Sequence, residues 1–261
     1  MHPGSIPGEA SNPDNRSSAG GAFLLAIGAW LRRKRDGWNM SADFSARRVK
    51  MVDGQLRTTD VTNAAVLDAF LAVPREAFLA ASQSDLAYID EDIRLAGVAG
   101  EPRYMMEPSP LAKLLQLAGI SADDTVLDVG AGTGYSAAIL SRIAKSVVAL
   151  ESDSTLAETA RATLSSLGCD NVVVVDGALR DGHAAKAPYN VILVGGSVEE
   201  VPQALLDQLA EGGRLVAVEG HGNAGVARLF LKTTGIAAGR RAFNAAIKPL
   251  PGFERVRVFE F

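Results

Sequence analysis

The chain has 261 residues, of which 48% are hydrophobic and 21% charged, and its formal net charge at pH 7 is −4. This length accommodates one sizeable α/β domain, and the composition is that of an ordinary globular protein. The small excess of acidic residues disfavours nucleic acid as the default partner. The single cysteine, Cys169, excludes an intrachain disulfide and fits a reducing cytoplasm, and the three scattered histidines lack metal-ligand spacing.

Residues 1–39 differ in composition from the rest of the chain. Gly, Ser, Pro and Asn dominate as far as Gly21, and an apolar run over 22–31 then leads into the basic run 32–35. The apolar run is too short to span a bilayer, and the basic residues follow it instead of preceding it as in a signal peptide. We expect a disordered tail or an extension that is not natively translated. A membrane-surface helix and an interaction segment are the alternatives.

Residues 40–110 form an N-terminal segment of mainly helical pattern. Apolar residues recur at helical spacing over 45–79, and proline and charged residues mark loops over 87–92 and 101–110. We expect this segment to pack with residues 111–261 as one compact unit.

Residues 111–261 alternate between apolar strands and helical segments, which is typical of a parallel sheet with both faces covered. The predicted strands are 125–129, 146–151, 171–176, 189–194 and 213–218, and the predicted helices are 111–117, 137–144, 156–167 and 201–209. Two further apolar stretches, 226–232 and 255–261, are predicted to be antiparallel closing strands. The expected fold class is therefore α/β, with a doubly wound, mostly parallel, Rossmann-like sheet.

Three alternate glycines, Gly130, Gly132 and Gly134, separate the first of these strands from a helix. Glycine lets such a loop adopt strained backbone angles and lets a ligand lie against the main chain. The third glycine is one residue early for a dinucleotide fingerprint, where Tyr135 stands, and no Lys-Ser/Thr pair follows as in a P-loop. Asp128 would repel a pyrophosphate and attract a sulfonium cation, so S-adenosylmethionine is the favoured ligand. A purely structural loop is the alternative.

The next two predicted strands also end in acids. In a doubly wound sheet, ligands bind beyond the carboxyl ends of the strands, where the strand order reverses. Glu151 follows Gly130 by about 20 residues, the distance at which an acid can accept both ribose hydroxyls, and Asp176 is placed for an adenine amino group. Any one of these acids could be a helix cap, but three in succession favour a nucleoside site.

From about residue 48 to 261 the chain resembles the protein-L-isoaspartate O-methyltransferases, a family of S-adenosylmethionine-dependent enzymes. The resemblance rests on Met51-Val-Asp-Gly-Gln-Leu56, Val73-Pro-Arg-Glu-Ala-Phe78, Ala87-Tyr88, Val126 to Tyr135, Asn171 to Gly177 and Gly212-Gly-Arg-Leu-Val216. It implies a carboxyl methyltransferase that acts on isoaspartyl residues of damaged proteins. A relative that methylates another carboxylate or a small molecule, or that only binds, is the alternative. The implied cofactor contacts are Asp128, Gly130, Ala131, Gly132, Gly134, Tyr135, Glu151, Ser152, Asp176, Gly177 and Ala178.

The loop before residue 111 departs from the family pattern. The family carries Gly-Gln-Thr-Ile-Ser-Gln-Pro there, with the Thr and Ser at the substrate carboxylate. This chain reads Pro-Arg-Tyr-Met-Met-Glu-Pro over 102–108, with Tyr104 in place of the Thr and Met106 in place of the Ser. We expect Arg103 to pair with the substrate carboxylate, Tyr104 to donate a hydrogen bond and Ser109 to replace the missing hydroxyl. A surface arginine, a packed tyrosine and a helix cap are the respective alternatives.

Overall fold

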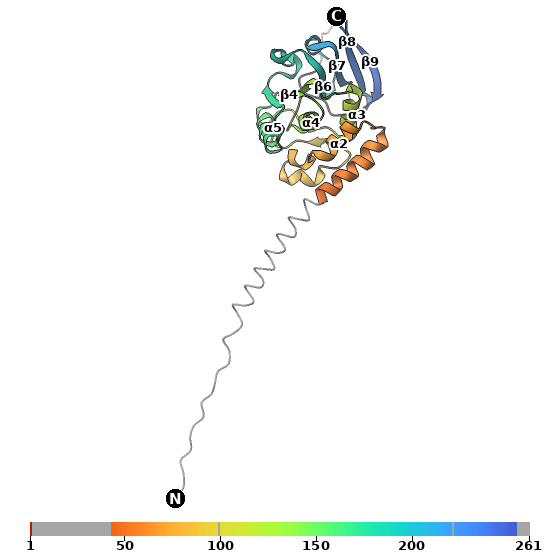
Figure 1. Cartoon of the computed structure of the whole chain (residues 1–261). Helices are drawn as coiled ribbons and strands as arrows, with labels where there is room; N and C mark the ends of the chain where they lie inside the picture. The colour runs from red at the N-terminus through yellow and green to blue at the C-terminus, as the bar shows by residue number, and fades with distance from the viewer. Residues whose placement is uncertain (2–42, 99, 221, 255–261) are drawn as a thin grey trace, which may run out of the picture. The chain divides into compact units, whose positions relative to one another are not determined.

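Seven strands pair into one sheet in a computed structural model of the protein, which describes residues 1, 43–98, 100–220 and 222–254 (Figure 1). The strand order is β5-β4-β3-β6-β7-β8-β9. β3 to β7 are parallel, and β8 and β9 form an antiparallel edge. The predicted mostly parallel sheet is therefore confirmed. The strands are β3 Thr125–Val129, β4 Ser146–Glu151, β5 Val172–Asp176, β6 Tyr189–Val198, β7 Leu209–Glu219, β8 Val226–Thr233 and β9 Ile236–Asn244.

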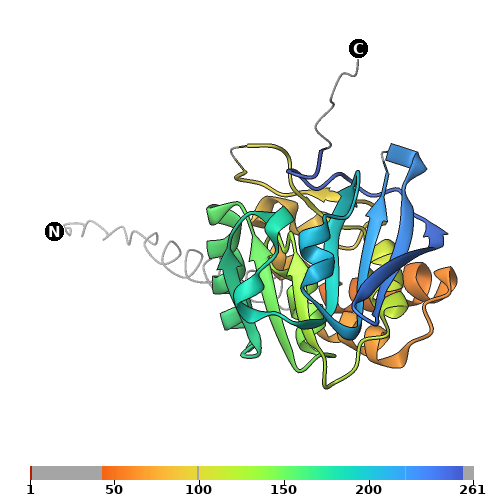
Figure 2. The ribbon, with the colours of Figure 1, turned by 90° about the horizontal axis from the view of Figure 1, so that it is seen from above.

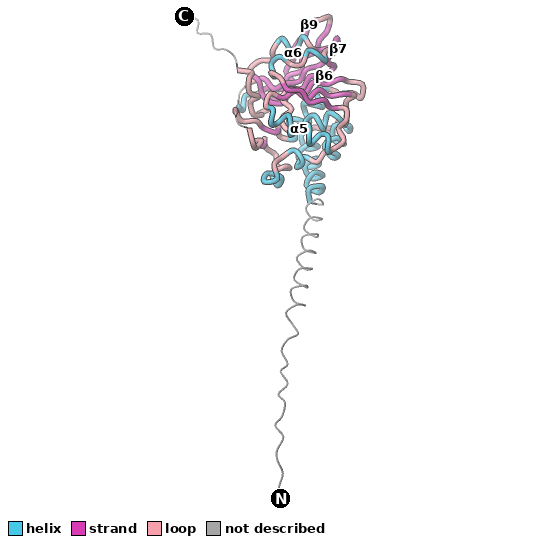
Figure 3. The backbone as a smooth tube through the Cα atoms, turned by 90° about the vertical axis from the view of Figure 1, so that its left-hand side faces the viewer, coloured by secondary structure: helices cyan, strands magenta, loops and turns pink. Residues whose placement is uncertain are grey.

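Helices cover both faces of this sheet. Figure 3 shows α5 and α6 on opposite sides of the strands. Because side chains alternate along a strand, Val126 belongs to one buried apolar cluster and Leu127 to the other. The helices are α3 Pro108–Ala118, α4 Tyr135–Ser141, α5 Ser154–Ser166 and α6 Gln203–Asp207.

The strand order reverses beside β3. The chain passes from β3 outward to β4 and β5, and then returns to form β6 on the other side of β3. Figure 2 shows the resulting twisted sheet from above, with the green strands toward one edge and the blue strands at the other. The carboxyl ends of β3 and β6 therefore flank the place where doubly wound sheets bind ligands.

The N-terminal segment is helical, as predicted, and packs on the face that carries α3 and α4. A helix over residues 43–51 continues through the wider turns of η1 and the tight turn of η2, and α2 follows. The described residues from Phe44 onward make up one compact unit. The elements are η1 Val52–Leu56, η2 Arg57–Thr59, α2 Ala64–Ala72, η3 Arg75–Phe78 and η4 Ala81–Leu86.

The predicted loop over 101–110 is partly regular structure. β1 (Ile93–Arg94) and β2 (Tyr104–Met105) form a two-stranded antiparallel sheet, and α3 already begins at Pro108. Proline is well suited to the first helical position because its missing N–H is not needed there. Neither the small sheet nor the early helix start was predicted.

The closing edge also differs in detail from the prediction. β8 pairs with β9, which the sequence analysis did not predict, through a turn whose Thr234 and Gly235 both have positive φ angles. β9 carries mostly exposed side chains and so lacks an apolar run. The predicted helix 201–209 is shorter, because Leu209 already belongs to β7. The predicted strand 255–261 and residues 2–39 of the predicted tail lie outside the described residues.

Within the part of the chain that the structure describes, no helix combines the length and the apolar character that a bilayer span requires.

Candidate functional site

The three alternate glycines lie at the point where the strand order reverses. Gly130, Gly132 and Gly134 have φ angles of 83°, 58° and 96°, a left-handed backbone that residues with a Cβ rarely adopt. The amide of Gly130 donates to the carbonyl oxygen of Leu150 over 2.9 Å, and Gly134 is the N-cap of α4. The loop is thus fixed between the end of β4 and the start of α4.

β6 approaches this loop at a residue without a side chain. A Cβ on Gly195 would lie 2.9 Å from the carbonyl oxygen of Gly130 and 3.1 Å from that of Val129. Any larger residue would therefore push the strand and the loop apart. Gly195 was not among the residues predicted for the site, although a glycine inside a strand signals such a close approach.

Asp128 is fully buried at the end of β3 and uses only one carboxylate oxygen. Its Oδ2 accepts a hydrogen bond of 2.6 Å from the Ser136 hydroxyl, whereas Oδ1 has no partner among the described residues. Burial raises the pKa of Asp128 to about 7, although the bond from Ser136 acts in the opposite direction. A buried oxygen without a partner is costly, so this position suits a ligand that brings a donor or a positive charge.

Glu151 is fully buried at the end of β4, and both of its oxygens are engaged. Arg103 Nη2 donates to Oε2 over 2.8 Å, and Arg103 Nη1 donates to Oε1. The amide of Gly132 also donates to Oε2 over 2.7 Å. The amides of Ser152 and Asp153 donate to Oε1 over 2.8 and 3.0 Å. The acid expected to meet the ribose is therefore paired with the arginine expected to meet the substrate.

Asp176 lies beside Glu151 in the register of β4 and β5. Its half-exposed side chain pairs with Arg161. The amide of Gly177 donates to the main-chain carbonyl of Glu151 over 3.1 Å, and Ala178 lies exposed at the start of a short helical turn. The strand-end acids thus share one edge of the sheet, while their contacts with a nucleoside remain predictions.

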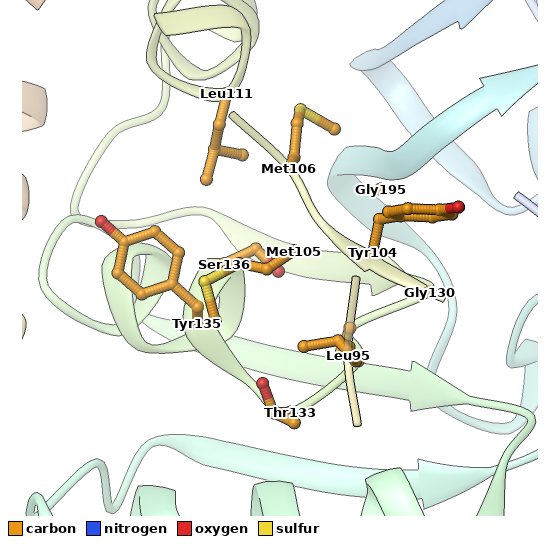
Figure 4. A pocket seen from close by; sticks show the side chains of 12 residues that line it. Leu95, Tyr104, Met105, Met106, Leu111, Gly130, Thr133, Tyr135, Ser136 and Gly195 are labelled. Carbon is orange, nitrogen blue, oxygen red and sulfur yellow. The ribbon is translucent and has the colours of Figure 1, made fainter. Parts of the chain in front are cut away.

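A small pocket of about 30 Å³ lies against the glycine loop (Figure 4). This is room for about one water molecule. One wall is the glycine loop with the start of α4, and Tyr104, Met105 and Met106 lie across from it. The structure thus brings together residues predicted to bind the cofactor and residues of the segment 102–108, the predicted acceptor loop. The full lining is Leu95, Tyr104, Met105, Met106, Leu111, Gly130, Ala131, Gly132, Thr133, Tyr135, Ser136 and Gly195.

Two of the predicted acceptor residues lie elsewhere or make other contacts. Ser109 is the second residue of α3, and its hydroxyl donates to Thr59 Oγ1 over 2.9 Å without lining the pocket. Arg103 is buried against Glu151 instead of facing the pocket. Tyr104 and Met106 do line it.

Arg75 is a fully buried arginine that the sequence analysis did not assign to the site. Its Nε donates to the carbonyl oxygen of Ala87 over 2.7 Å, and its Nη2 donates to that of Met106 over 2.8 Å. Its guanidinium carbon lies 4.6 Å from the centroid of the Tyr135 ring. Arg75 therefore connects the N-terminal segment, the acceptor loop and α4. An arginine inside the apolar motif Val73 to Phe78 was the available signal.

The family model and similar known proteins point to the same family. The family model described as protein-L-isoaspartate(D-aspartate) O-methyltransferase matches residues 46–244. A protein-L-isoaspartate O-methyltransferase of Koribacter versatilis is 40% identical over 173 residues, which is 66% of this chain and 76% of that protein. One from Methanoregula boonei is 38% identical over 176 residues, covering 67% of this chain and 79% of the relative.

Solved structures agree with this comparison. A protein-L-isoaspartate O-methyltransferase superposes with a TM-score of 0.70 and 29% identity, over 78% of this chain and 66% of that one. A putative protein-L-isoaspartate O-methyltransferase from Plasmodium falciparum, in complex with S-adenosyl-L-homocysteine, gives a TM-score of 0.64 over 77% of this chain and 96% of that one. At 21% identity, the second structure supports the shared fold alone.

Proposed function

Because the chain belongs to the protein-L-isoaspartate O-methyltransferase family, we propose that it uses S-adenosylmethionine to methylate the carboxylate of isoaspartyl residues in proteins. The observation that carries the proposal is the glycine loop at the reversal point of the sheet, with the unpaired buried oxygen of Asp128 beside it. An acid in this position fits a cationic ligand and would repel a phosphate. The left-handed glycines let that ligand lie close to the main chain of the loop.

We assign different residues to different parts of S-adenosylmethionine. Asp128 meets the positively charged end, and Ser136 holds its carboxylate in place. Glu151 would accept from the ribose, with Ser152 beside it, and Asp176 would accept from the adenine. Gly130, Ala131, Gly132, Gly134 and Tyr135 would hold the methionine part, and Gly177 and Ala178 would lie near the adenine.

The chemistry asks little of the side chains. S-adenosylmethionine, when bound, supplies an electrophilic methyl group on a sulfonium. An acceptor carboxylate is already deprotonated at neutral pH, so the protein needs to align it and exclude water and does not need a general base. The apolar side chains of Leu95, Met105, Met106 and Leu111 are suited to excluding water from the pocket.

The acceptor is held by the segment 102–108 and its surroundings. We assign Tyr104 to donate a hydrogen bond to the acceptor, Met106 to pack against it and Arg103 to pair with its carboxylate after the rearrangement argued below. Ser109 is a weaker candidate, because its hydroxyl already bonds to Thr59.

A second candidate function is methylation of a different carboxylate or small molecule, or binding without catalysis. It is favoured by Met106, a thioether where the family has a hydroxyl, and by the engagement of Arg103 with Glu151. Both features change the surroundings of the acceptor and leave the glycine loop intact.

Methyl transfer from labelled S-adenosylmethionine to an isoaspartyl peptide, beside its aspartyl twin, tests the proposal. We expect label in the isoaspartyl peptide alone. Cofactor binding without label in either peptide would favour the second candidate, and absence of cofactor binding would refute both. As partner we propose a protein substrate and no nucleic acid, from the net charge of −4. The single cysteine supports a reducing cytoplasm as location.

A further inference from the structure

Arg103 and Glu151 form a buried ion pair where the ribose of a cofactor is expected. The two side chains are 5% and 0% exposed. Both Nη atoms of the guanidinium donate to the two carboxylate oxygens, one bond each. A two-pronged contact of this kind is the strongest that an arginine makes with a carboxylate, and it occupies the outward edge of the acid.

Glu151 has no capacity left for a ribose. A carboxylate offers about four lone-pair positions, and this one already accepts from Arg103 and from the amides of Gly132, Ser152 and Asp153. The amides belong to the glycine loop and to the turn after β4, so they cannot leave without unfolding both. Only Arg103 donates from the end of a long side chain. The ribose hydroxyls can therefore reach Glu151 only if Arg103 withdraws.

The same pair adjoins two hollows. Glu151 accepts from the amide of Gly132, which lines the pocket of about 30 Å³ against the glycine loop. Arg103 lines an open hollow of about 240 Å³ together with Ser152, Asp153 and Glu101. A nucleoside ligand commonly requires a continuous space of about 300 Å³ or more. Withdrawal of Arg103 would enlarge the open hollow that it lines and expose Glu151 to it.

The main chain of Arg103 is tied to the acceptor side. Its carbonyl oxygen accepts from the amide of Leu95 over 2.8 Å, and Tyr104, the next residue, begins β2. Both Leu95 and Tyr104 line the pocket. A guanidinium that leaves Glu151 therefore stays within reach of the pocket, where a carboxylate acceptor would supply the partner that it has lost.

We propose that Arg103 exchanges partners during the reaction: it holds Glu151 while the cofactor site is empty, and it pairs with the acceptor carboxylate once a ribose has taken its place. Arg103 is then the residue that makes acceptor binding depend on prior cofactor binding. This inference rests on the proposed function. It adds that the cofactor binds before the acceptor and that Arg103 selects acceptors with a carboxylate.

Isothermal titration of the full chain with S-adenosylhomocysteine tests the first half of the exchange. Arg103→Met removes the guanidinium and leaves an unbranched apolar side chain in its place. We expect it to bind S-adenosylhomocysteine roughly tenfold more tightly than the wild type, as for a site that is closed about nine-tenths of the time. Arg94→Met is the matched control, since Arg94 is exposed and belongs to β1 of the same small sheet, and it should bind like the wild type.

Steady-state kinetics with an isoaspartyl peptide at saturating cofactor test the second half. Arg103→Met should raise the KM for the peptide about tenfold or more, because a two-pronged contact with its carboxylate is lost. Arg103→Lys, which keeps the charge and loses the fork, should give intermediate values in both assays. If the Met variant does not fold, the Kd and KM of the Lys variant test the exchange instead.

The outcomes are separable. Unchanged or weaker binding of S-adenosylhomocysteine by the Arg103 variants overturns the exchange, and so does tighter binding with an unchanged KM. A wild-type protein that does not bind S-adenosylhomocysteine overturns the proposed function itself, and the exchange with it.

Discussion

Glu107 belongs to the segment 102–108 and lies in a crowded acidic environment. Burial raises its pKa to about 7, and Asp90, Asp92 and Glu91 act in the same direction. The folded protein therefore holds this proton more tightly than the unfolded chain, where the pKa is about 4.3. The stability associated with the bound proton is present below about pH 4.3 and is lost as the pH rises through about 7.

Replacing Glu107 by Gln should remove this loss. We expect Glu107→Gln to melt at the same temperature as the wild type near pH 4.5 and at a higher temperature at pH 8, measured by thermal denaturation across that range. Glu158→Gln, at an exposed position on α5, is the control and should follow the wild type throughout. A Glu107→Gln curve parallel to the wild type would contradict the assignment.

The pKa of Asp128 is raised, like that of Glu107, and Asp128 is also proposed to contact the cofactor. Its pKa is raised to about 7 chiefly by burial, so its charge costs stability above that pH, whereas Asp128→Asn carries no charge. The variant should be more stable than the wild type at pH 8 and similar near pH 4. It should bind S-adenosylhomocysteine at least about tenfold more weakly, because a hydrogen bond to a charged group is worth about 1.5–3 kcal/mol. Thermal melts and calorimetry on one preparation check both effects, and tighter binding would refute the assigned role.

The contact between β6 and the glycine loop depends on the absence of one side chain. A methyl group on Gly195 would lie 2.9 Å from the carbonyl oxygen of Gly130, and main-chain atoms cannot rotate away as side chains can. We expect Gly195→Ala to lower the free energy of unfolding by about 1–3 kcal/mol and to weaken cofactor binding. Urea denaturation measures the first effect. Gly54→Ala is the control, because a Cβ there meets nothing within 4 Å and its φ is not positive.

The elements that the sequence predicted well are those whose own composition determines them. The five parallel strands are apolar, and all but the edge strand β5 are largely buried on both faces. They could be located within a few residues. β9 and the small β1–β2 sheet could not, because they are held by pairing with neighbours and not by an apolar run. The edge strand Ile236–Asn244 contains a glycine and two consecutive arginines among apolar residues, so it shows neither a continuous apolar run nor a clear alternation.

In the candidate site, too, some features could be predicted from the local sequence and others depend on contacts between distant residues. The glycine loop and the acids at the strand ends were predictable, because strand-end position and the doubly wound topology together bring them to one edge of the sheet. The pairing of Arg103 with Glu151 was not, since it joins residues 48 positions apart through side-chain geometry. Gly195 and Arg75 were missed for a related reason, because their importance lies in which backbone atoms they approach.

The N-terminal segment, the acceptor loop and the sheet domain meet at Arg75. Its guanidinium donates to the carbonyl oxygens of Ala87 and Met106 and lies over the ring of Tyr135. These three residues come from three separate parts of the chain, and Met106 and Tyr135 both line the pocket. Arg75 therefore couples the packing of the N-terminal segment to the shape of the acceptor side of the site.

Replacing Arg75 by Met should keep most of the buried volume and leave both carbonyl oxygens without a donor. Each buried group left unpaired costs about 1–3 kcal/mol, so we expect the free energy of unfolding to fall by roughly 2–6 kcal/mol. Arg57→Met is the control, because Arg57 is about half exposed in an i,i+4 pair with Asp53 and should cost less than about 1 kcal/mol. Urea denaturation followed by circular dichroism gives both values. Arg75 bonds directly to Met106 of the segment 102–108 and reaches the cofactor side only through the ring of Tyr135. The KM of the folded variant for an isoaspartyl peptide should therefore rise by a larger factor than its Kd for S-adenosylhomocysteine. Loss of cofactor affinity with an unchanged KM would show that Arg75 acts on the cofactor side instead.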